Sequence, residues 1–258
     1  MMSRALRLRT ISTIVMMPIV LIAVYVGGWW LASGLSLFYV FSANEWSRIC
    51  EEGGSTPVSW LNLFGGLPII YIGFSGHLAL LWPTLALLFA VNLVIPPFIG
   101  LSGGTVGMDL FGQIYMSLPL SFLLRLRAFG FTPAALALIL VWASDIGAYL
   151  VGSAIGRHKL SARLSPGKSW EGLAGGLAFA IITGGVALPI FLHRTVLEGV
   201  LIGAAASVLA ACGDLGESAI KRWANAKDSG NFMPGHGGFL DRVDSLLFAL
   251  PALYYLLR

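Results

Sequence analysis

Side chains able to do acid, base or phosphate chemistry gather in one stretch of this chain, residues 214–245, although only 11% of the 258 residues are charged. Its first part places two acids, a hydroxyl and a base at i, i+3, i+4 and i+7, on one face of a predicted helix: Asp214, Glu217, Ser218 and Lys221. A second helix face follows, at i, i+3 and i+4: Asp241, Asp244 and Ser245. Two acidic helix ends joined by a basic, glycine-rich loop can hold a divalent cation and a polyphosphate together.

The rest of the chain is a membrane-embedded scaffold for that stretch. A mean hydropathy of +0.84 excludes an ordinary soluble protein. A membrane-spanning helix needs about 20 mostly apolar residues, and the long uncharged runs predict an all-α, polytopic integral membrane protein with about nine transmembrane helices. The expected spans lie at about 10–27, 29–43, 59–75, 77–97, 108–124, 133–155, 171–192, 197–219 and 239–257.

The placement of Lys and Arg predicts the orientation. With nine spans, 12 of the 16 basic residues fall on the side of the N-terminus, and only Arg125, Arg127, Arg194 and Arg258 fall on the other side. Because positive loops stay inside, we expect a multi-pass protein of the inner (cytoplasmic) membrane whose polar cavity and active site face the cytoplasm. The net charge of +4 also favours anionic lipid and nucleotide ligands. No basic soluble module argues for nucleic-acid binding.

A second cluster begins at Asp145, inside an apolar span. Asp145, Tyr149, Gly152 and Gly156 share one helix face, and the glycines allow another helix to approach closely. An ionisable group within a span is a functional hypothesis by default; the alternative is a structural pairing with a basic or backbone group.

A positively charged loop, 157–170, follows this span. Pro166 and Gly167 predict a turn, and Ser169 is a candidate cap for the next helix, with Glu171 in its first turn. A lysine just before a helix N-terminus, here Lys168, favours anion binding. The alternative is a capped helix after a loop that simply follows the positive-inside rule.

Together these segments resemble the phosphatidate cytidylyltransferase (CDP-diacylglycerol synthase) family. The residues at the spacing of its signature are Ser218, Lys221-Arg222, Lys227-Asp228-Ser229-Gly230, Pro234-Gly235-His236-Gly237-Gly238, Asp241-Arg242 and Asp244. The family's Ser-Pro-x-Lys-[Ser/Thr]-x-Glu-Gly motif is similar to 165–172, after an Asp-x-x-Ala-Tyr span that is similar to 145–149. The resemblance is strong over about 140–250 and general elsewhere, which makes 1–130 a scaffold of transmembrane helices and 131–258 a catalytic region.

The resemblance implies transfer of CMP from CTP to phosphatidate, giving CDP-diacylglycerol and pyrophosphate. It implies Mg²⁺ or another divalent cation, for which the expected ligands are Asp214 and Asp241. The expected catalytic residues are Lys221, Arg222, Lys227, Asp228, His236 and Asp244. The expected substrate-binding residues are Asp145, Ser165, Lys168, Ser169, Glu171, Ser218 and Arg242. The lipid bilayer is the other expected partner, and a homodimer is a candidate assembly.

Purely structural or topological roles stay open for several of these residues. The basic residues of the 221–227 segment are also what the positive-inside rule places there, Asp244 is also placed to orient Arg242, and His236 is also placed to stabilise the glycine turn. A proton-coupled transporter and a CDP-alcohol phosphotransferase are the competing classes. The chain shows neither internal repeats nor an Asp-Gly-x-x-Ala-Arg motif, which weakens both.

The N-terminal half carries little predicted chemistry. We expect Glu45 to be a solvated charge and Trp46 an interfacial anchor at the end of the second span. Asp109 is expected to cap a helix at its start.

Overall fold

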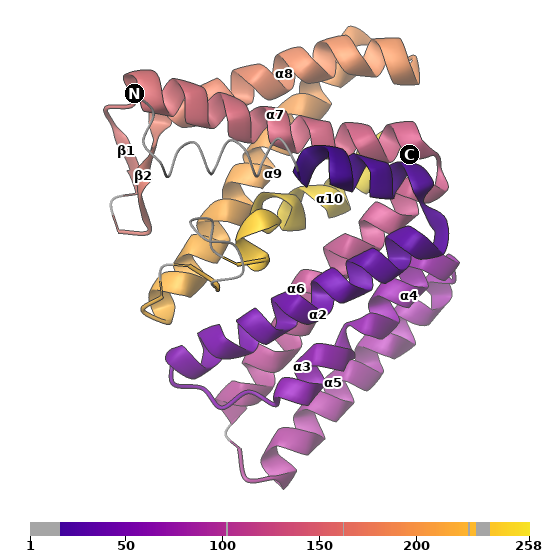
Figure 1. Cartoon of the computed structure of the whole chain (residues 1–258), viewed down its shortest axis with the longest axis vertical. Coiled ribbons are helices and arrows are strands. Elements are labelled where there is room, and N and C mark those ends of the chain that lie inside the picture. Colours follow the sequence, from indigo (N-terminus) through magenta and orange to yellow (C-terminus); the bar gives the residue numbers. More distant parts are fainter. Residues whose placement is uncertain (1–15, 102, 162, 227, 231–237) are drawn as a thin grey trace. The chain divides into compact units, whose positions relative to one another are not determined.

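The structure is a computed structural model, which describes residues 16–101, 103–161, 163–226, 228–230 and 238–258. These residues are overwhelmingly helical, which confirms the all-α prediction (Figure 1). The chain divides into two compact units: unit 1 comprises Met1–Arg125 and Trp223–Arg242, and unit 2 comprises Leu126–Arg222 and Val243–Arg258. The functional division into 1–130 and 131–258 stays a prediction.

Unit 1 contains the N-terminal helices and residues 223–242, the middle of the 214–245 stretch. An apolar helix, Met16–Val26, precedes the first labelled helix. The labelled elements are α2 (Gly28–Glu52), α3 (Ser59–Gly65), α4 (Leu67–Ser75), the 3₁₀ turn η1 (Leu78–Leu80), α5 (Leu81–Phe98), nearly all of α6 (Gly103–Ala128) and the 3₁₀ turn η2 (Leu240–Arg242).

Helix α2 continues well beyond the predicted span 29–43, and this overturns two expectations. The helix ends at Glu52, so Glu45 and Trp46 lie inside it rather than at its end. Trp46 is fully buried and donates from Nε1 to the carbonyl oxygen of Met108, 3.1 Å away. Glu45 is only 5% exposed and is not a solvated charge. The buried face of α2 extends across the polar residues, so the apolar run alone gave too short a helix.

The predicted span 59–75 is interrupted at Gly66, where α3 ends and α4 begins. The hydroxyl of Tyr39 donates to the carbonyl of Asn62 at 2.6 Å and accepts from the Gly66 N–H at 2.9 Å. It therefore satisfies backbone groups that the break leaves without helical partners. A Cβ added at Gly66 would collide with the Tyr39 ring, so this close approach requires glycine.

Asp109 is not a cap at the start of its own helix; it lies inside α6 and is fully buried. Its carboxylate accepts from the backbone N–H of Val58, the residue that precedes α3, at 2.9 Å, and from Asn62 Nδ2 at 2.8 Å. Asn62 also accepts from Gln113, which in turn bonds Asn92 on α5. A buried carboxylate is costly unless it is hydrogen-bonded, and this network supplies the bonds while joining α3, α5 and α6.

Unit 2 contains the remaining helices and the only strands among the described residues. Its elements are α7 (Phe131–Ile155), β1 (Lys159–Ser161), β2 (Ser165–Ser169), α8 (Trp170–Leu192), α9 (Val196–Trp223, of which all but the last residue belongs to this unit) and α10 (Asp244–Leu257). The two strands pair antiparallel, with Lys159 opposite Ser169 and Ser161 opposite Ser165. Pro166 and Gly167 therefore lie in a strand and not in the predicted turn.

Glycines bring the helices of unit 2 into backbone contact. Helices α7 and α8 lie side by side (Figure 1), with Gly152 of α7 packed against Gly172 of α8. Farther along α8, Gly184 packs against Gly199 of α9, and a Cβ at either would overlap the carbonyl oxygen of the other. This confirms that the glycine face of α7 admits a neighbouring helix.

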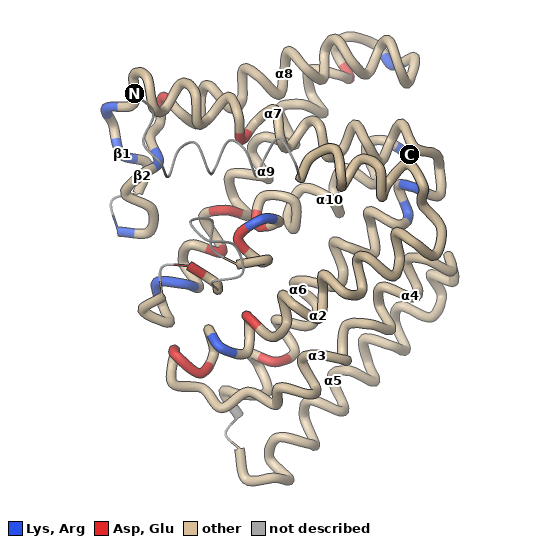
Figure 2. Tube along the Cα trace, viewed as in Figure 1, with Lys and Arg blue, Asp and Glu red and all other residues tan. Residues whose placement is uncertain are grey.

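Four helical segments among the described residues are long and apolar enough to cross a membrane: Leu78–Phe98, Phe131–Ile155, Trp170–Leu192 and Val196–Trp223. Figure 2 shows the long uncharged stretches of α5, α7 and α8. Shorter apolar helices occur at Met16–Val26, Ser59–Ser75 and Asp244–Leu257. These features fit a multi-pass membrane protein, and the total of nine spans stays a prediction.

Candidate active site

An ion pair joins the hairpin of unit 2 to α9. Lys168, near the end of β2, places its ammonium nitrogen 2.5 Å from Asp214 Oδ2. The Lys168 nitrogen is itself buried, and this carboxylate is its partner, although the two side chains as a whole are 26% and 34% exposed. A lysine from the Ser-Pro-x-Lys motif and the first acid of the 214–245 stretch therefore meet in space.

Helices α7 and α10 add two more carboxylates. Ser245 Oγ lies 3.3 Å from Asp145 Oδ1, and the Ser245 N–H donates to Asp244 Oδ1 at 2.8 Å. Asp145 and Asp244 both lie close enough to Asp214 to interact with its charge. Three carboxylates from α7, α9 and α10 thus share one region of unit 2, close to Lys168. Asp145 is within hydrogen-bond distance of a hydroxyl and also interacts with the charge of Lys168, so its functional and structural interpretations both stay predictions.

A second lysine lies on α9, in an ion pair within the helix. Lys221 Nζ is 3.2 Å from Glu217 Oε1, at i and i+4, and the Glu217 side chain is fully buried. Glu217 also interacts electrostatically with Asp244. Gly213 packs against the Asp244 carbonyl, and a Cβ there would overlap it. The glycine therefore allows the start of α10 to approach α9 and sets the spacing of these acids.

The hairpin motif is held by its own hydroxyl and carboxylate groups. Ser169 caps α8, since its Oγ accepts from the Gly172 N–H at 3.1 Å, which confirms the predicted cap. Glu171 accepts from the backbone N–H of Arg157 and of His158, and lies 2.6 Å from His158 Nδ1. Ser165 lies at the start of β2. A second contact joins the hairpin to α9, because Arg222 Nε donates to the carbonyl oxygen of Leu164, just before β2, at 3.3 Å.

The signature residues from Lys227 to Arg242 belong to unit 1, whereas Asp244 belongs to unit 2. Asp241 Oδ2 accepts from Ser229 N at 2.9 Å, from Ser229 Oγ at 2.8 Å and from Gly238 N at 2.8 Å. Three donors on one oxygen fix the orientation of this carboxylate. Asp228 and Arg242 are exposed. Because Asp214 belongs to unit 2, the sharing of one metal ion by Asp214 and Asp241 stays a prediction.

Lys227 and His236 lie outside the described residues. Ser218 is half-buried on α9, next to Glu217.

One acid that the sequence analysis set aside lies against the signature. The Glu45 carboxylate of α2 accepts hydrogen bonds from Ser229 Oγ, Phe239 N and Leu240 N, all within unit 1. The signal that identifies it is periodicity: Ser42, Glu45 and Ile49 lie at i, i+3 and i+7 and are all buried. Because Glu45 continues the buried face of α2, it requires a polar partner inside the protein. Its position directly after an apolar run instead suggested a charged helix end.

Carboxylate oxygens are the donor set that Mg²⁺ prefers, so the acids of these two clusters fit the predicted ion chemically. No three acidic, histidine or cysteine side chains converge as a ligand group in the part of the chain that the structure describes. This arrangement is compatible with Mg²⁺, which usually takes one or two protein carboxylates and completes its shell with phosphates and water.

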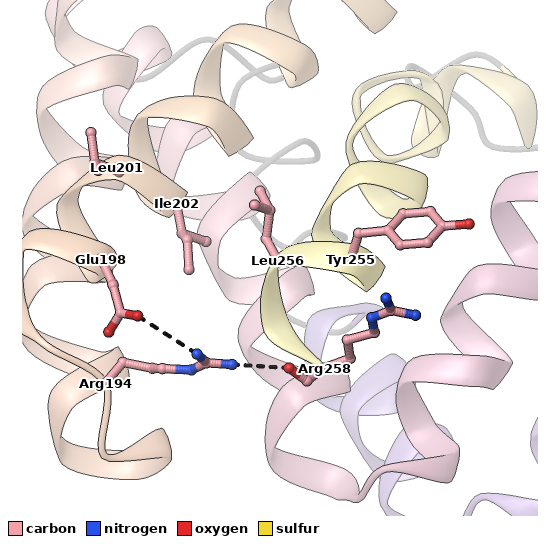
Figure 3. A pocket seen from close by; sticks show the side chains of 7 residues that line it. All are labelled: Arg194, Glu198, Leu201, Ile202, Tyr255, Leu256 and Arg258. Carbon is pink, nitrogen blue, oxygen red and sulfur yellow. Dashed lines mark hydrogen bonds and ion pairs between the residues drawn. The ribbon is translucent and has the colours of Figure 1, made fainter.

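A pocket of about 370 Å³ lies elsewhere in unit 2, between the first turns of α9 and the end of α10 (Figure 3). It is lined by Arg194, Glu198, Leu201, Ile202, Tyr255, Leu256 and Arg258. Arg194 donates to the Arg258 carbonyl and lies 3.7 Å from Glu198, so the polar groups of the lining largely bind one another. The pocket contains none of the predicted site residues and we assign it no part in the chemistry.

The helices and the lysine–carboxylate clusters define a multi-pass membrane protein whose polar residues suit phosphate-bearing substrates. The chain belongs to the cytidylyltransferase family, whose model matches residues 7–258. The family assignment favours the cytidylyltransferase class over a transporter and over a CDP-alcohol phosphotransferase.

Curated relatives support this assignment over nearly the whole chain. The chain is 37% identical to the phosphatidate cytidylyltransferase of Brucella melitensis, over 96% of this chain and 92% of the relative. It is 36% identical to the phosphatidate cytidylyltransferase of Pseudomonas aeruginosa, over 98% and 97% of the two chains. The enzyme of the same name from Bacillus subtilis is 40% identical over a shorter stretch, 59% of this chain and 58% of the relative.

Proposed function

We propose that this member of the cytidylyltransferase family is a phosphatidate cytidylyltransferase of phospholipid biosynthesis. A phosphate oxygen of phosphatidate attacks the α-phosphorus of CTP, and a new P–O–P bond forms. The bond from the α-phosphorus to the oxygen that bridges it to the β-phosphorus breaks, so pyrophosphate leaves and CDP-diacylglycerol remains. The observation that carries this proposal is the Lys168–Asp214 pair, because it joins the Ser-Pro-x-Lys motif to the helix that leads into the C-terminal signature.

The chemistry requires charge neutralisation rather than a strong base. The nucleophile is a phosphate oxygen that is already largely ionised near neutral pH, so it needs no strong base. Both reactants are anions, so the protein must offset their mutual repulsion. Lys168 has three N–H donors, so it can keep Asp214 and still donate to a phosphate oxygen. Lys221 and Arg222 lie at the end of α9, where they would offset the charge that develops on pyrophosphate. Lys227 would add to them.

Acidic residues would hold the divalent cation. Asp214 and Asp241 are the proposed ligands, and Asp244 is placed near Asp214 to assist. When bound, Mg²⁺ neutralises phosphate charge and orients the reacting phosphates. Asp145 would then orient Ser245 and Lys168 rather than bind the ion, since its oxygen already lies within hydrogen-bond distance of Ser245.

The membrane arrangement is part of the proposal. Phosphatidate keeps its acyl chains in the bilayer while CTP arrives from water, so the lysine–carboxylate cluster must face the cytoplasm at the membrane boundary. The bias of Lys and Arg supports an inner-membrane protein of about nine spans with this orientation. A homodimer is the proposed assembly, and the mass of the purified protein in detergent tests it.

The direct test is an assay of the purified protein in detergent with phosphatidate and either CTP or ATP, with and without Mg²⁺. We expect the protein to form CDP-diacylglycerol with CTP and to form no corresponding product with ATP. A chelator should abolish this activity, and added Mg²⁺ should restore it. Asp214→Asn and Asp241→Asn should each abolish this activity while the protein remains folded by thermal unfolding. Full activity in either variant would remove that residue from the metal site, and equal rates with ATP would contradict the nucleotide assignment.

A further inference from the structure

Two carboxylates of unit 1, Glu45 and Asp241, lie far apart in the sequence but accept hydrogen bonds from the same short part of the signature. Glu45 Oε2 accepts from Ser229 Oγ at 3.0 Å and from Leu240 N at 3.0 Å, and Glu45 Oε1 accepts from Phe239 N at 2.9 Å. Asp241 Oδ2 accepts from the same Ser229 hydroxyl at 2.8 Å and from the Gly238 N–H at 2.8 Å. We call the four residues Glu45, Ser229, Gly238 and Asp241 the clasp.

The clasp explains two signature glycines. A Cβ added at Gly230 would lie 2.6 Å from Glu45 Oε1, and one added at Gly238 would collide with Glu45 Oε2. Real Cβ atoms do not come that close to a carboxylate oxygen, so a side chain at either position would force Glu45 to move. Both glycines therefore leave room for the Glu45 carboxylate in the position where it bonds Ser229, Phe239 and Leu240.

Ser229 links the two acids through one hydroxyl group. A serine hydroxyl has a single hydrogen to donate, yet both carboxylates lie within hydrogen-bond distance of it. A displacement of Glu45 therefore changes the bond that Ser229 makes to Asp241. This is a physical path from α2 to the predicted metal ligand, with one residue between them.

Apolar contacts hold the same segment on α2. The Phe239 ring stacks on Phe41, with centroids 4.9 Å apart and planes 10° apart, and it meets Phe38 edge-on at 5.3 Å. The segment would thus stay on α2 by aromatic packing even without Glu45. The carboxylate contributes what packing does not, namely fixed hydrogen-bond acceptors for the Phe239 and Leu240 N–H groups and for Ser229.

We infer that Glu45 is a positioning residue of the cytidylyltransferase reaction: it holds Ser229 and the backbone of 238–240, and through them it orients the carboxylate of Asp241. Glu45 itself contacts neither substrate nor metal in this role. The inference rests on the proposed function for the role of Asp241, although the clasp itself can be tested without activity.

The test compares Glu45→Gln with Glu52→Gln, a matched control at an exposed position of the same helix. The glutamine has the same shape, but an NH₂ group replaces one of the two oxygens that accept from Phe239 N and Leu240 N, so one of these backbone N–H groups faces a donor instead of an acceptor. Hydrogen–deuterium exchange of peptides covering 238–245 should be faster in Glu45→Gln and unchanged in Glu52→Gln. In the assay, loss of such an outer contact should lower kcat about 10- to 100-fold and raise the Mg²⁺ concentration for half-maximal activity.

Ser229→Ala provides a second route if Glu45→Gln folds poorly. Because both variants act on Asp241 through one hydroxyl, the double variant should lose little more than the more severe single variant. Additive losses would overturn the inference. The inference would also be overturned if Glu45→Gln kept the wild-type kcat, Mg²⁺ midpoint and hydrogen–deuterium exchange. The same holds if Glu45→Gln lowered the Tm and left catalysis unchanged. If the wild-type protein makes no CDP-diacylglycerol, or makes it without a divalent ion, the proposed function or its metal fails, whereas the exchange comparison still decides whether the clasp exists.

Discussion

Replacement of Lys168 distinguishes a structural role of the Lys168–Asp214 ion pair from a role of Lys168 in the reaction. The Lys168→Met variant keeps the length of the side chain and removes its charge. The two partners are 26% and 34% exposed, so solvent weakens the pair, and we set its contribution to the free energy of unfolding at about 1 kcal/mol, the upper end for exposed pairs. The upper end is appropriate because the Lys168 nitrogen itself is buried.

The catalytic effect should be much larger than the structural one. Removing a group that stabilises developing charge in a transition state typically costs about 100- to 1000-fold in kcat. We therefore expect Lys168→Met to lose activity on that scale while its Tm falls by only a few degrees. A thermal-unfolding measurement in detergent and a CDP-diacylglycerol assay at saturating CTP and phosphatidate give the two numbers. Separate KM values for the two substrates identify which phosphate Lys168 meets.

The matched control is Lys159→Met. Lys159 is an exposed lysine of the same hairpin, paired with Ser169 across the two strands. It should keep near wild-type activity, because it has no contact with the acids of α9. Retention of more than a third of the wild-type kcat by a folded Lys168→Met variant would refute the catalytic role and leave only a structural pair.

Three further predictions concern the scaffold and are measured by thermal unfolding in detergent. Gly203→Ala should destabilise the protein by about 1–3 kcal/mol, because its Cβ would overlap the Ala180 carbonyl; Gly34→Ala on α2, with open space around it, should instead be neutral or slightly stabilising, and equal effects would contradict the packing. Asp109→Leu should cost about 2–3 kcal/mol by leaving buried donors unpaired, and Asp109→Asn clearly less; equal losses would refute a hydrogen-bonding role. Ser169→Ala should cost about 1 kcal/mol through the lost cap of α8, and an unchanged Tm would argue against it.

The sequence predicted the helical class and most helix positions, because long apolar runs determine both. The predicted spans 133–155, 171–192 and 197–219 correspond to α7, α8 and α9 within a few residues. Apolar runs were poorer guides where a helix continues through polar residues that face inward, as in α2, or where a helix breaks without losing hydrophobicity, as at Gly66. In both cases long-range contacts decide the outcome, and a hydropathy pattern carries no information on them.

The candidate site was predictable to the extent that it lies in motifs. Lys168 was indicated by its motif and Asp214 by the acidic helix face that starts the 214–245 stretch, but neither pattern predicts that the two side chains meet. Glu45 was missed because its partners lie about 190 residues away in the sequence, as the separation of 194 between Glu45 and Phe239 shows. The hairpin turn was placed wrongly because Pro166 and Gly167 favour turns locally, while pairing with β1 extends them into a strand.

The glycine contacts of unit 2 have a consequence for the carboxylates that its helices carry. Where Gly152 meets Gly172 and Gly184 meets Gly199, main chain rests on main chain, with no side chains between that could change rotamer and let the helices slide. Such a bundle resists being sheared, and it carries Asp145 and Asp214 on two of its members. Because α8 contacts α7 and α9 in this way, Asp145 and Asp214 should keep a constant separation when other parts of the protein move.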